Sequence, residues 1–97
     1  MTEFSLFATI TPKPAHYAEA LAALQGIIPQ TLDEPGCLRF ELNTGQGDDG
    51  NLYLVEHWAD LQALEYHYAQ PYSTAVFDAY QNWLAKPPQI VKMNRNT

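Results

Sequence analysis

Hydrophobic residues recur along the chain with two different periods, one typical of strands and one typical of helices. Cys37–Asn43 and Leu52–Trp58 alternate with a period of two, and the Gly- and Asp-rich stretch 44–50 lies between them. These segments predict a β-hairpin. Phe4–Ile10 is rich in aromatic and β-branched residues and predicts an earlier strand, and Gln89–Met93 predicts a short final strand.

A helical period fills the chain between the first strand and the hairpin. Apolar residues within 15–32 recur at spacings of four, three, four and four, which predicts one stripe of an amphipathic helix, formed by Tyr17, Leu21, Leu24, Ile28 and Leu32. Pro29 has no amide hydrogen, so we expect the helix to kink near Gly26, or to end there and restart. Glu34-Pro35-Gly36 ends the segment, with Gly36 expected in a left-handed turn.

Two further helical segments follow the hairpin. Asp60 is a candidate N-cap for a helix whose apolar stripe contains Leu61, Leu64 and Tyr68. Gln70-Pro71 interrupts this pattern, and residues 72–84 predict a stronger helix that Pro87-Pro88 ends.

The order of these elements is strand, helix, strand, repeated once. With right-handed crossovers, this order predicts an α+β fold of the ferredoxin-like kind, a four-stranded antiparallel sheet with helices on one face. The 97 residues match one domain, 1–97, which is large enough to bury a core without disulfides or metals.

Neither hairpin strand has a wholly polar face. Leu38, Phe40 and Leu42 are expected to share one face of the first strand, opposite Cys37, Arg39, Glu41 and Asn43. In the second strand, Leu52, Leu54, Glu56 and Trp58 are expected to lie opposite Tyr53, Val55 and His57. A sheet with only one covered face normally exposes a polar one. We therefore expect both faces to be covered, one by the helices and one by a second subunit in a homodimer.

Composition narrows the possible partners. The formal net charge of −6 argues against nucleic acid, whose phosphates would be repelled. Two Trp, six Tyr and four Phe with few charges suggest a surface buried against a partner or around an aromatic ligand. The chain has a single cysteine and no signal-peptide pattern. It also has no apolar run near the ~20 residues that span a bilayer. We therefore expect a cytoplasmic protein without a membrane segment.

Three stretches carry a resemblance to a known family: residues 34–42 (EPGCLRFEL), residues 55–60 (VEHWAD), and the pair Leu64 and His67. They resemble the antibiotic biosynthesis monooxygenase domain family of the dimeric α+β barrel superfamily. The resemblance implies a homodimer whose sheets pack into a barrel, with a pocket between sheet and helices in each subunit. Members include cofactor-free monooxygenases of phenols or quinols, haem-degrading enzymes and proteins of signal-molecule breakdown.

The resemblance also implies site residues. The family's E-x-W element falls on Glu56 and Trp58, and its helix histidine falls on His67. The haem-degrading branch uses an asparagine on the first strand, and Phe4–Ile10 contains none. The resemblance therefore favours the cofactor-free monooxygenases of phenols or quinols over the haem-degrading branch.

Each of these residues also has a structural interpretation. His67 is either a general base near neutral pH or a histidine that satisfies a backbone carbonyl at the pocket rim. Trp58 either fills the core or forms a wall against a flat substrate. Glu56 either makes a structural hydrogen bond or ion pair, for example with Arg39 or a helix terminus, or is a carboxylate of raised pKa that orients His67.

The remaining candidates indicate no metal or cofactor. His57 is expected at the subunit interface and His16 in solvent, and no paired ligand spacing is present, so no metal site is predicted. Cys37 is expected to be a small buried residue rather than a nucleophile. The tyrosines cannot be sorted into core and pocket.

Two functional hypotheses follow. The first is a cofactor-independent monooxygenase that oxidises a small electron-rich phenol or quinol with O₂, with His67 as acid/base, Trp58 shaping the pocket and Glu56 in support. The second is a non-catalytic dimeric barrel that binds a small aromatic metabolite.

Overall fold

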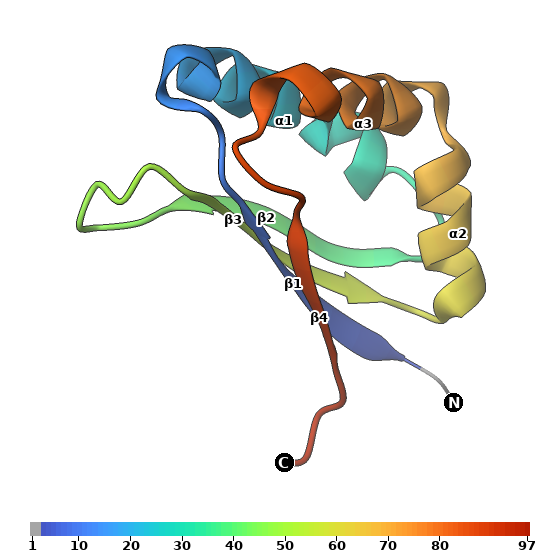
Figure 1. Cartoon of the computed structure of the whole chain (residues 1–97). Coiled ribbons are helices and arrows are strands. Elements are labelled where there is room, and N and C mark those ends of the chain that lie inside the picture. The colour runs from blue at the N-terminus through green and yellow to red at the C-terminus, as the bar shows by residue number, and fades with distance from the viewer. Residues whose placement is uncertain (1–2) are drawn as a thin grey trace.

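The computed structural model describes residues 3–97, in which strands and helices follow the predicted order (Figure 1). The strands are β1 (Phe4–Ile10), β2 (Cys37–Thr44), β3 (Leu52–Trp58) and β4 (Gln89–Met93). The helices are α1 (Tyr17–Leu32), α2 (Leu61–Ala69) and α3 (Pro71–Trp83), and a short 3-10 turn, η1 (Pro14–His16), precedes α1.

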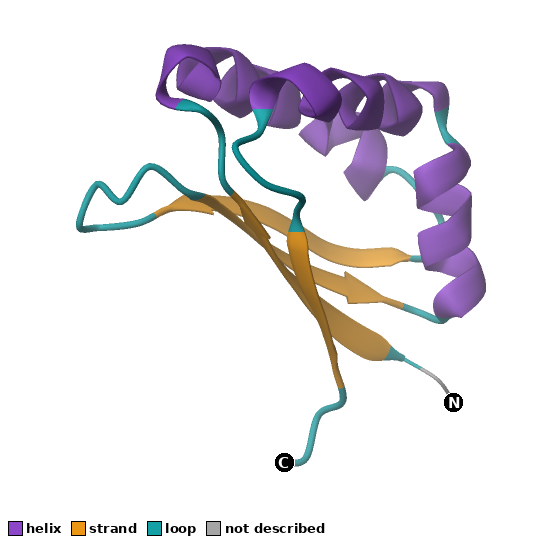
Figure 2. Cartoon of the chain, viewed as in Figure 1, coloured by secondary structure: helices purple, strands orange, loops and turns teal. Residues whose placement is uncertain are grey.

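The four strands form one antiparallel sheet in the order β2-β3-β1-β4. All three α-helices lie on the same side of it, as the purple and orange layers in Figure 2 show. The ferredoxin-like α+β prediction is confirmed. The central pair, β1 and β3, is in register from Phe4 opposite Trp58 to Ile10 opposite Leu52.

The core lies between this sheet and the helices. Every second residue of the central strands points toward the helices and is buried, including Leu6, Ala8 and Ile10 on β1 and Leu52, Leu54 and Trp58 on β3. Asp60 begins α2 as predicted, because its side chain accepts a hydrogen bond from the Ala63 amide at 2.8 Å. Gln70 and Pro71 separate α2 from α3.

The buried stripe of α1 differs from the predicted one. The buried residues are Ala20, Leu24, Ile27 and Thr31, whereas Leu32 is 50% exposed. The stripe is rotated because small residues allow the helix to pack closely, and the Thr31 hydroxyl is satisfied by the Ile27 carbonyl at 2.8 Å. The larger side chains at Leu21 and Ile28 flank this stripe and are partly buried.

The expectation that the first helix ends near Gly26 and restarts is wrong. α1 continues through Gly26 and Pro29 to Leu32, and the Pro29 carbonyl accepts a hydrogen bond from the Asp33 amide at 3.2 Å. Pro29 is exposed, so its ring meets solvent. Packing of the buried stripe on both sides of the proline holds the helix together despite the missing hydrogen bond.

A β-bulge between Cys37 and Arg39 changes the predicted faces of β2. Because the bulge adds one residue, Leu38 is 50% exposed and does not share the buried face of Phe40. Cys37 instead pairs with Trp58 and packs against the core.

Gly36 has a different role from the predicted one, because its φ angle is not in the left-handed region. A Cβ atom at this position would lie 2.2 Å from the Cβ of Ala63 on α2. Glycine is needed here for the close approach of the loop to the helix.

The face of the sheet opposite the helices is uncovered in a single chain. Phe7 and Tyr53 stack on it with ring centroids 5.9 Å apart, and Val91 is 55% exposed. His57 also points to this face and lies 3.4 Å from Glu3. Among residues 3–97, no helix is both long enough and apolar enough to cross a membrane.

Candidate active site

A cavity of about 50 Å³ lies between the sheet and the helices. Its walls are mostly apolar and come from β1, α1, β3 and α3, and they include Leu6, Leu54 and Val76. The polar side chains in the lining are Glu56, His67, Ser73 and the hydroxyls of Tyr68 and Tyr80. A few polar groups in an apolar enclosure are typical of a small-molecule site.

Glu56 is a buried carboxylate in the centre of the sheet. It is 5% exposed, and its neighbours across the strands are Leu6 and Phe40. Burial raises the pKa of Glu56 to about 7, although a hydrogen bond from Trp58 opposes this rise and the charge of Glu34 adds to it. The carboxyl group therefore titrates near neutral pH inside the cavity.

The partner of Glu56 is Trp58, which lies two residues further along the same face of β3. The Trp58 Nε1 atom donates a hydrogen bond to Glu56 Oε1 at 2.9 Å. Arg39, the suggested ion-pair partner, instead pairs with Glu41 at 2.9 Å on the exposed edge strand. The interpretation of Glu56 as a hydrogen-bonded group is confirmed, and its pairing with Arg39 is wrong.

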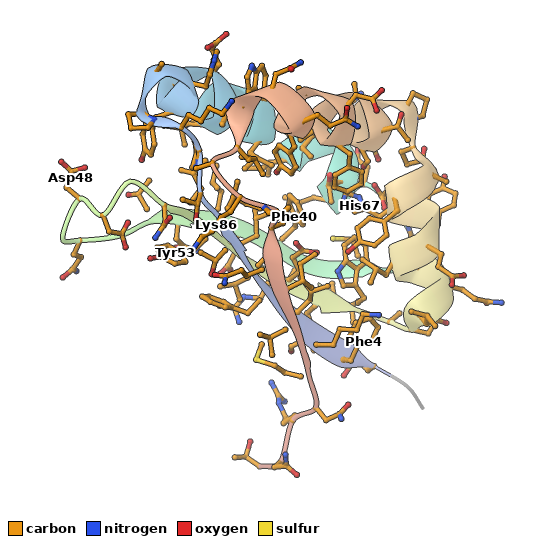
Figure 3. The ribbon with its side chains drawn as sticks, in the orientation of Figure 1. Phe4, Phe40, Asp48, Tyr53, His67 and Lys86 are labelled. Carbon is orange, nitrogen blue, oxygen red and sulfur yellow. The ribbon has the colours of Figure 1, made fainter. Side chains whose placement is uncertain are left out.

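His67 lies on α2 and points into the layer between sheet and helices, close to Phe40, as Figure 3 shows. It is 4% exposed, and its Nδ1 atom lies 2.9 Å from Glu34 Oε2. Ser73 Oγ lies 3.5 Å from the same nitrogen. Among residues 3–97, no hydrogen bond reaches Nε2, so this nitrogen is the one left for a molecule in the cavity. His67 does not satisfy a backbone carbonyl.

Glu34 holds His67 from outside the cavity. The carboxylate is 6% exposed, and its Oε2 atom also accepts a hydrogen bond from the Tyr72 hydroxyl. A carboxylate on Nδ1 fixes the tautomer in which Nδ1 carries the proton and Nε2 is an acceptor. The predicted orienting carboxylate was Glu56, but the structure places Glu34 in this position.

Aromatic rings pack around the imidazole and restrict its orientation. The centroids of Trp58 and His67 are 5.0 Å apart, and those of Phe40 and His67 are 5.4 Å apart. Trp58 is fully buried and is not part of the cavity lining. It contacts the site through Glu56 and His67.

The structure brings together Glu56, Trp58 and His67. It adds Glu34 and Ser73, which the sequence did not predict, and Tyr72, one of the tyrosines that the sequence could not sort. Glu34 belongs to the Glu-Pro-Gly stretch at residues 34–36, for which the sequence predicts only a turn. It lies 33 positions before His67, and no spacing rule predicts that contact.

The tyrosines can now be sorted. Tyr68 and Tyr80 line the cavity, whereas Tyr53 lies on the uncovered face of the sheet and Tyr66 is 53% exposed. Burial raises the pKa of Tyr68 to about 12, and burial likewise raises the pKa of Tyr80. Both hydroxyls therefore remain protonated at neutral pH and can donate hydrogen bonds.

Two other predicted groups, Cys37 and His16, do not line the cavity. Burial raises the pKa of the Cys37 thiol to about 11, which makes it a poor nucleophile at neutral pH. His16 lies in η1 and pairs with Glu19 at 2.6 Å. Within residues 3–97, no three His, Cys, Asp or Glu side chains are grouped so that they could hold a metal ion.

Fold and site together define a small ferredoxin-like α+β fold with a mostly apolar cavity between sheet and helices. The sequence profile of the family described as "Antibiotic biosynthesis monooxygenase" matches residues 4–83. The chain belongs to the antibiotic biosynthesis monooxygenase family, and the resemblance identified from the sequence is confirmed.

One curated relative is similar to most of this chain. An uncharacterized Synechocystis protein, sll1783, is 31% identical over 81 residues, which are 84% of this chain and 55% of that protein. The chain therefore spans just over half the length of that relative.

Solved structures match over nearly the whole chain. The crystal structure of PA3566 from Pseudomonas aeruginosa has a TM-score of 0.93 and 27% identity, and the match covers 100% of this chain and 97% of that one. The structure of Rv0793 from Mycobacterium tuberculosis has a TM-score of 0.92 at 23% identity, covering 99% and 97%.

Proposed function

We propose that this chain is a monooxygenase that oxidises a small electron-rich phenol or quinol with O₂ and without a bound cofactor. The observation that carries the proposal is the His67 imidazole, which is buried at the cavity with Nδ1 held by Glu34 at 2.9 Å and with no hydrogen bond to Nε2 from any of residues 3–97. Family membership supports the reaction class, and the aromatic lining suits a flat substrate.

The reaction begins with removal of a proton. His67 Nε2 accepts the proton of the substrate hydroxyl, and Glu34 stabilises the resulting imidazolium because its carboxylate is bonded to Nδ1. The phenolate formed is an electron-rich, delocalised anion. An apolar enclosure keeps water from this anion and holds it flat.

The remaining steps need no external reductant. The phenolate gives one electron to O₂, and the phenoxyl radical and superoxide combine to form a carbon–oxygen bond at a ring carbon that bears hydrogen. The peroxide anion then loses that hydrogen as a proton while its O–O bond breaks, which gives a quinone. This proton and the one held by His67 convert the departing oxygen to water. One phenol and one O₂ give one quinone and one H₂O, so atoms and electrons balance.

Glu56 has a supporting role in this proposal. Because its pKa is about 7, the group is partly protonated at neutral pH and can either donate to or accept from a second substrate oxygen. Trp58 fixes the Glu56 carboxyl through its indole N–H and packs beside His67. Trp58 is thus a positioning residue.

The test is oxygen uptake with a panel of phenols and hydroquinones. We expect His67→Ala to lower kcat about 10²–10⁴-fold, as is typical for loss of a general base. Glu34→Gln should lower kcat less, because His67 keeps its imidazole but loses the carboxylate that orients it. Glu65→Gln, an exposed glutamate on the same helix as His67, is the matched control.

Unchanged turnover in His67→Ala would remove His67 from the mechanism. Tight binding of hydroquinones without oxygen uptake would instead support the alternative, a non-catalytic dimeric barrel that binds an aromatic metabolite.

We also propose that two copies pack through their uncovered sheet faces into a dimeric barrel. This face is apolar around Phe7, Tyr53 and Val91, with Val91 55% exposed. Light scattering at micromolar concentration should give the mass of a dimer, and Val91→Lys should shift it toward a monomer. Leu61→Lys, which changes a side chain that is 50% exposed on α2, should leave the mass unchanged. A monomeric wild-type chain would contradict the proposal.

A further inference from the structure

An open groove of about 400 Å³ lies outside the candidate active site, along the end of α3 and the loop that leads into β4. Its own lining consists of Gln81, Leu84, Lys86 and Pro87. It shares Phe77, Tyr80 and Pro88 with the inner cavity. These three residues therefore form the partition between the two spaces.

The inner cavity is too small for the substrate proposed above. A cavity that binds benzene measures roughly 150 Å³, whereas about 10–15 Å³ holds one water. The inner cavity, at about 50 Å³, holds only a few waters in this conformation. An aromatic ring can enter only if part of the wall moves.

Phe77 is the part of the partition best able to move. Its side chain is 39% exposed, whereas Tyr80 is 7% exposed. The Phe77 ring makes edge contacts with Tyr68 and Tyr80, at centroid distances of 5.4 Å and 6.0 Å. If the ring swings outward, it exchanges two edge contacts for solvent and joins the cavity to the groove.

The groove lining carries a positive charge. Among residues 3–97, Lys86 is the one charged side chain in this lining, in a chain whose formal net charge is −6. The rest of the lining is apolar apart from Gln81 and the Tyr80 hydroxyl. An elongated apolar ligand with one anionic end matches this arrangement.

We infer that the groove is the outer half of the substrate site. Phe77 is then the movable partition between the inner cavity, which holds the aromatic ring, and the groove, which holds an alkyl side chain of the substrate. The substrate class is then a phenol or quinol with an alkyl side chain that ends in a carboxylate, held by Lys86. This inference rests on the proposed function for the identity of the ring.

Binding measured in the absence of oxygen tests whether the groove recognises a carboxylate on the ligand. Titration calorimetry under nitrogen would compare a hydroquinone bearing a short alkyl carboxylate with the same compound as its primary amide. We expect the carboxylate to bind tighter to the wild type, and Lys86→Gln to reduce its affinity about two- to fivefold, as expected for an exposed ion pair. Lys13→Gln removes the same charge from a position outside the groove lining and should leave the preference intact.

Several results would overturn the inference: equal affinity of carboxylate and amide for the wild type, a preference that survives in Lys86→Gln, or no binding of either compound at millimolar concentration. None of these results depends on oxygen uptake. A chain that prefers the carboxylate through Lys86 but consumes no oxygen would contradict the proposed reaction and support the assignment of the groove as a ligand site.

The partition has its own test. Stopped-flow tryptophan fluorescence should show a severalfold faster association of the carboxylate compound with Phe77→Ala, and a smaller change with Phe77→Leu. Thermal unfolding by circular dichroism confirms that both variants are folded. An association rate unchanged in Phe77→Ala would exclude Phe77 as the partition.

Discussion

Substitution of Glu56 by glutamine should make the protein more stable at pH 8 and remove most of the pH dependence of its stability near neutrality. The Glu56 carboxyl is 5% exposed, and it accepts a hydrogen bond from the Trp58 indole N–H. Glutamine keeps an oxygen that can accept this hydrogen bond, has nearly the same volume and carries no charge. The substitution therefore isolates the effect of ionising a buried carboxyl group.

The magnitude follows from the pKa. Burial raises the Glu56 pKa from 4.5 to about 7, which corresponds to about 3 kcal/mol. At a pH between these two pKa values, the Glu56 carboxyl has lost its proton in the unfolded chain and retains it in the folded chain. The free energy of unfolding therefore falls as pH rises from about 4.5 to about 7 and is constant with respect to this group above that range.

The assay is urea unfolding at fixed protein concentration at pH 5 and pH 8, since association with a second copy would otherwise alter the apparent stability. The wild type should lose stability between the two pH values relative to Glu56→Gln, by an amount on the order of 2–3 kcal/mol. Glu65→Gln, which removes an exposed carboxylate, should follow the wild type. Parallel pH profiles for the wild type and Glu56→Gln would refute the argument that burial of Glu56 raises its pKa.

Three other substitutions test the fold around the site. Pro29→Ala should raise the free energy of unfolding by up to about 3 kcal/mol in urea unfolding, because it restores an amide donor at an exposed position inside α1. Asp60→Ala should lower it by about 1 kcal/mol in the same assay, because α2 loses its N-cap. Gly36→Ala should lower it by about 1–3 kcal/mol, because the new Cβ overlaps that of Ala63. The double substitution Gly36→Ala with Ala63→Gly removes the overlapping atom and should recover part of this loss, whereas additive losses would contradict the overlap.

The order and type of the elements could be predicted because each signal is local. The alternation in Leu52–Trp58 predicted β3 with its observed bounds. Pro71 marked the boundary between α2 and α3, and Pro87 marked the loop after α3. The buried stripe of α1 could not be predicted in the same way. The predicted stripe was drawn through the large apolar side chains. In the structure the helix packs closely on the sheet, and small residues such as Ala20 and Thr31 are the buried ones.

The same distinction between local and tertiary signals applies to the candidate site. Glu56 and Trp58 share one face of one strand, so their proximity follows from the two-residue period, and the Trp58–Glu56 hydrogen bond is a local contact. The bulge at Leu38 and the contact between His67 and Glu34 depend on how separate elements pack. A bulge has no composition signal in this strand, and a contact across 33 positions is decided by tertiary packing rather than by spacing.

The turn at residues 34–36 explains how fold and site are joined. The Gly36 carbonyl accepts a hydrogen bond from the Ala59 amide at 2.9 Å, and the absence of a side chain at Gly36 lets the turn lie directly on Ala63. Ala63 lies four residues before His67, which is one helical turn, so the same approach that seats the turn on α2 brings the Glu34 carboxylate to the imidazole. A larger residue at position 36 would push the loop outward and lengthen the distance from Glu34 to His67. The glycine is thus required for the geometry of the proposed acid/base pair, although it lies outside the cavity lining.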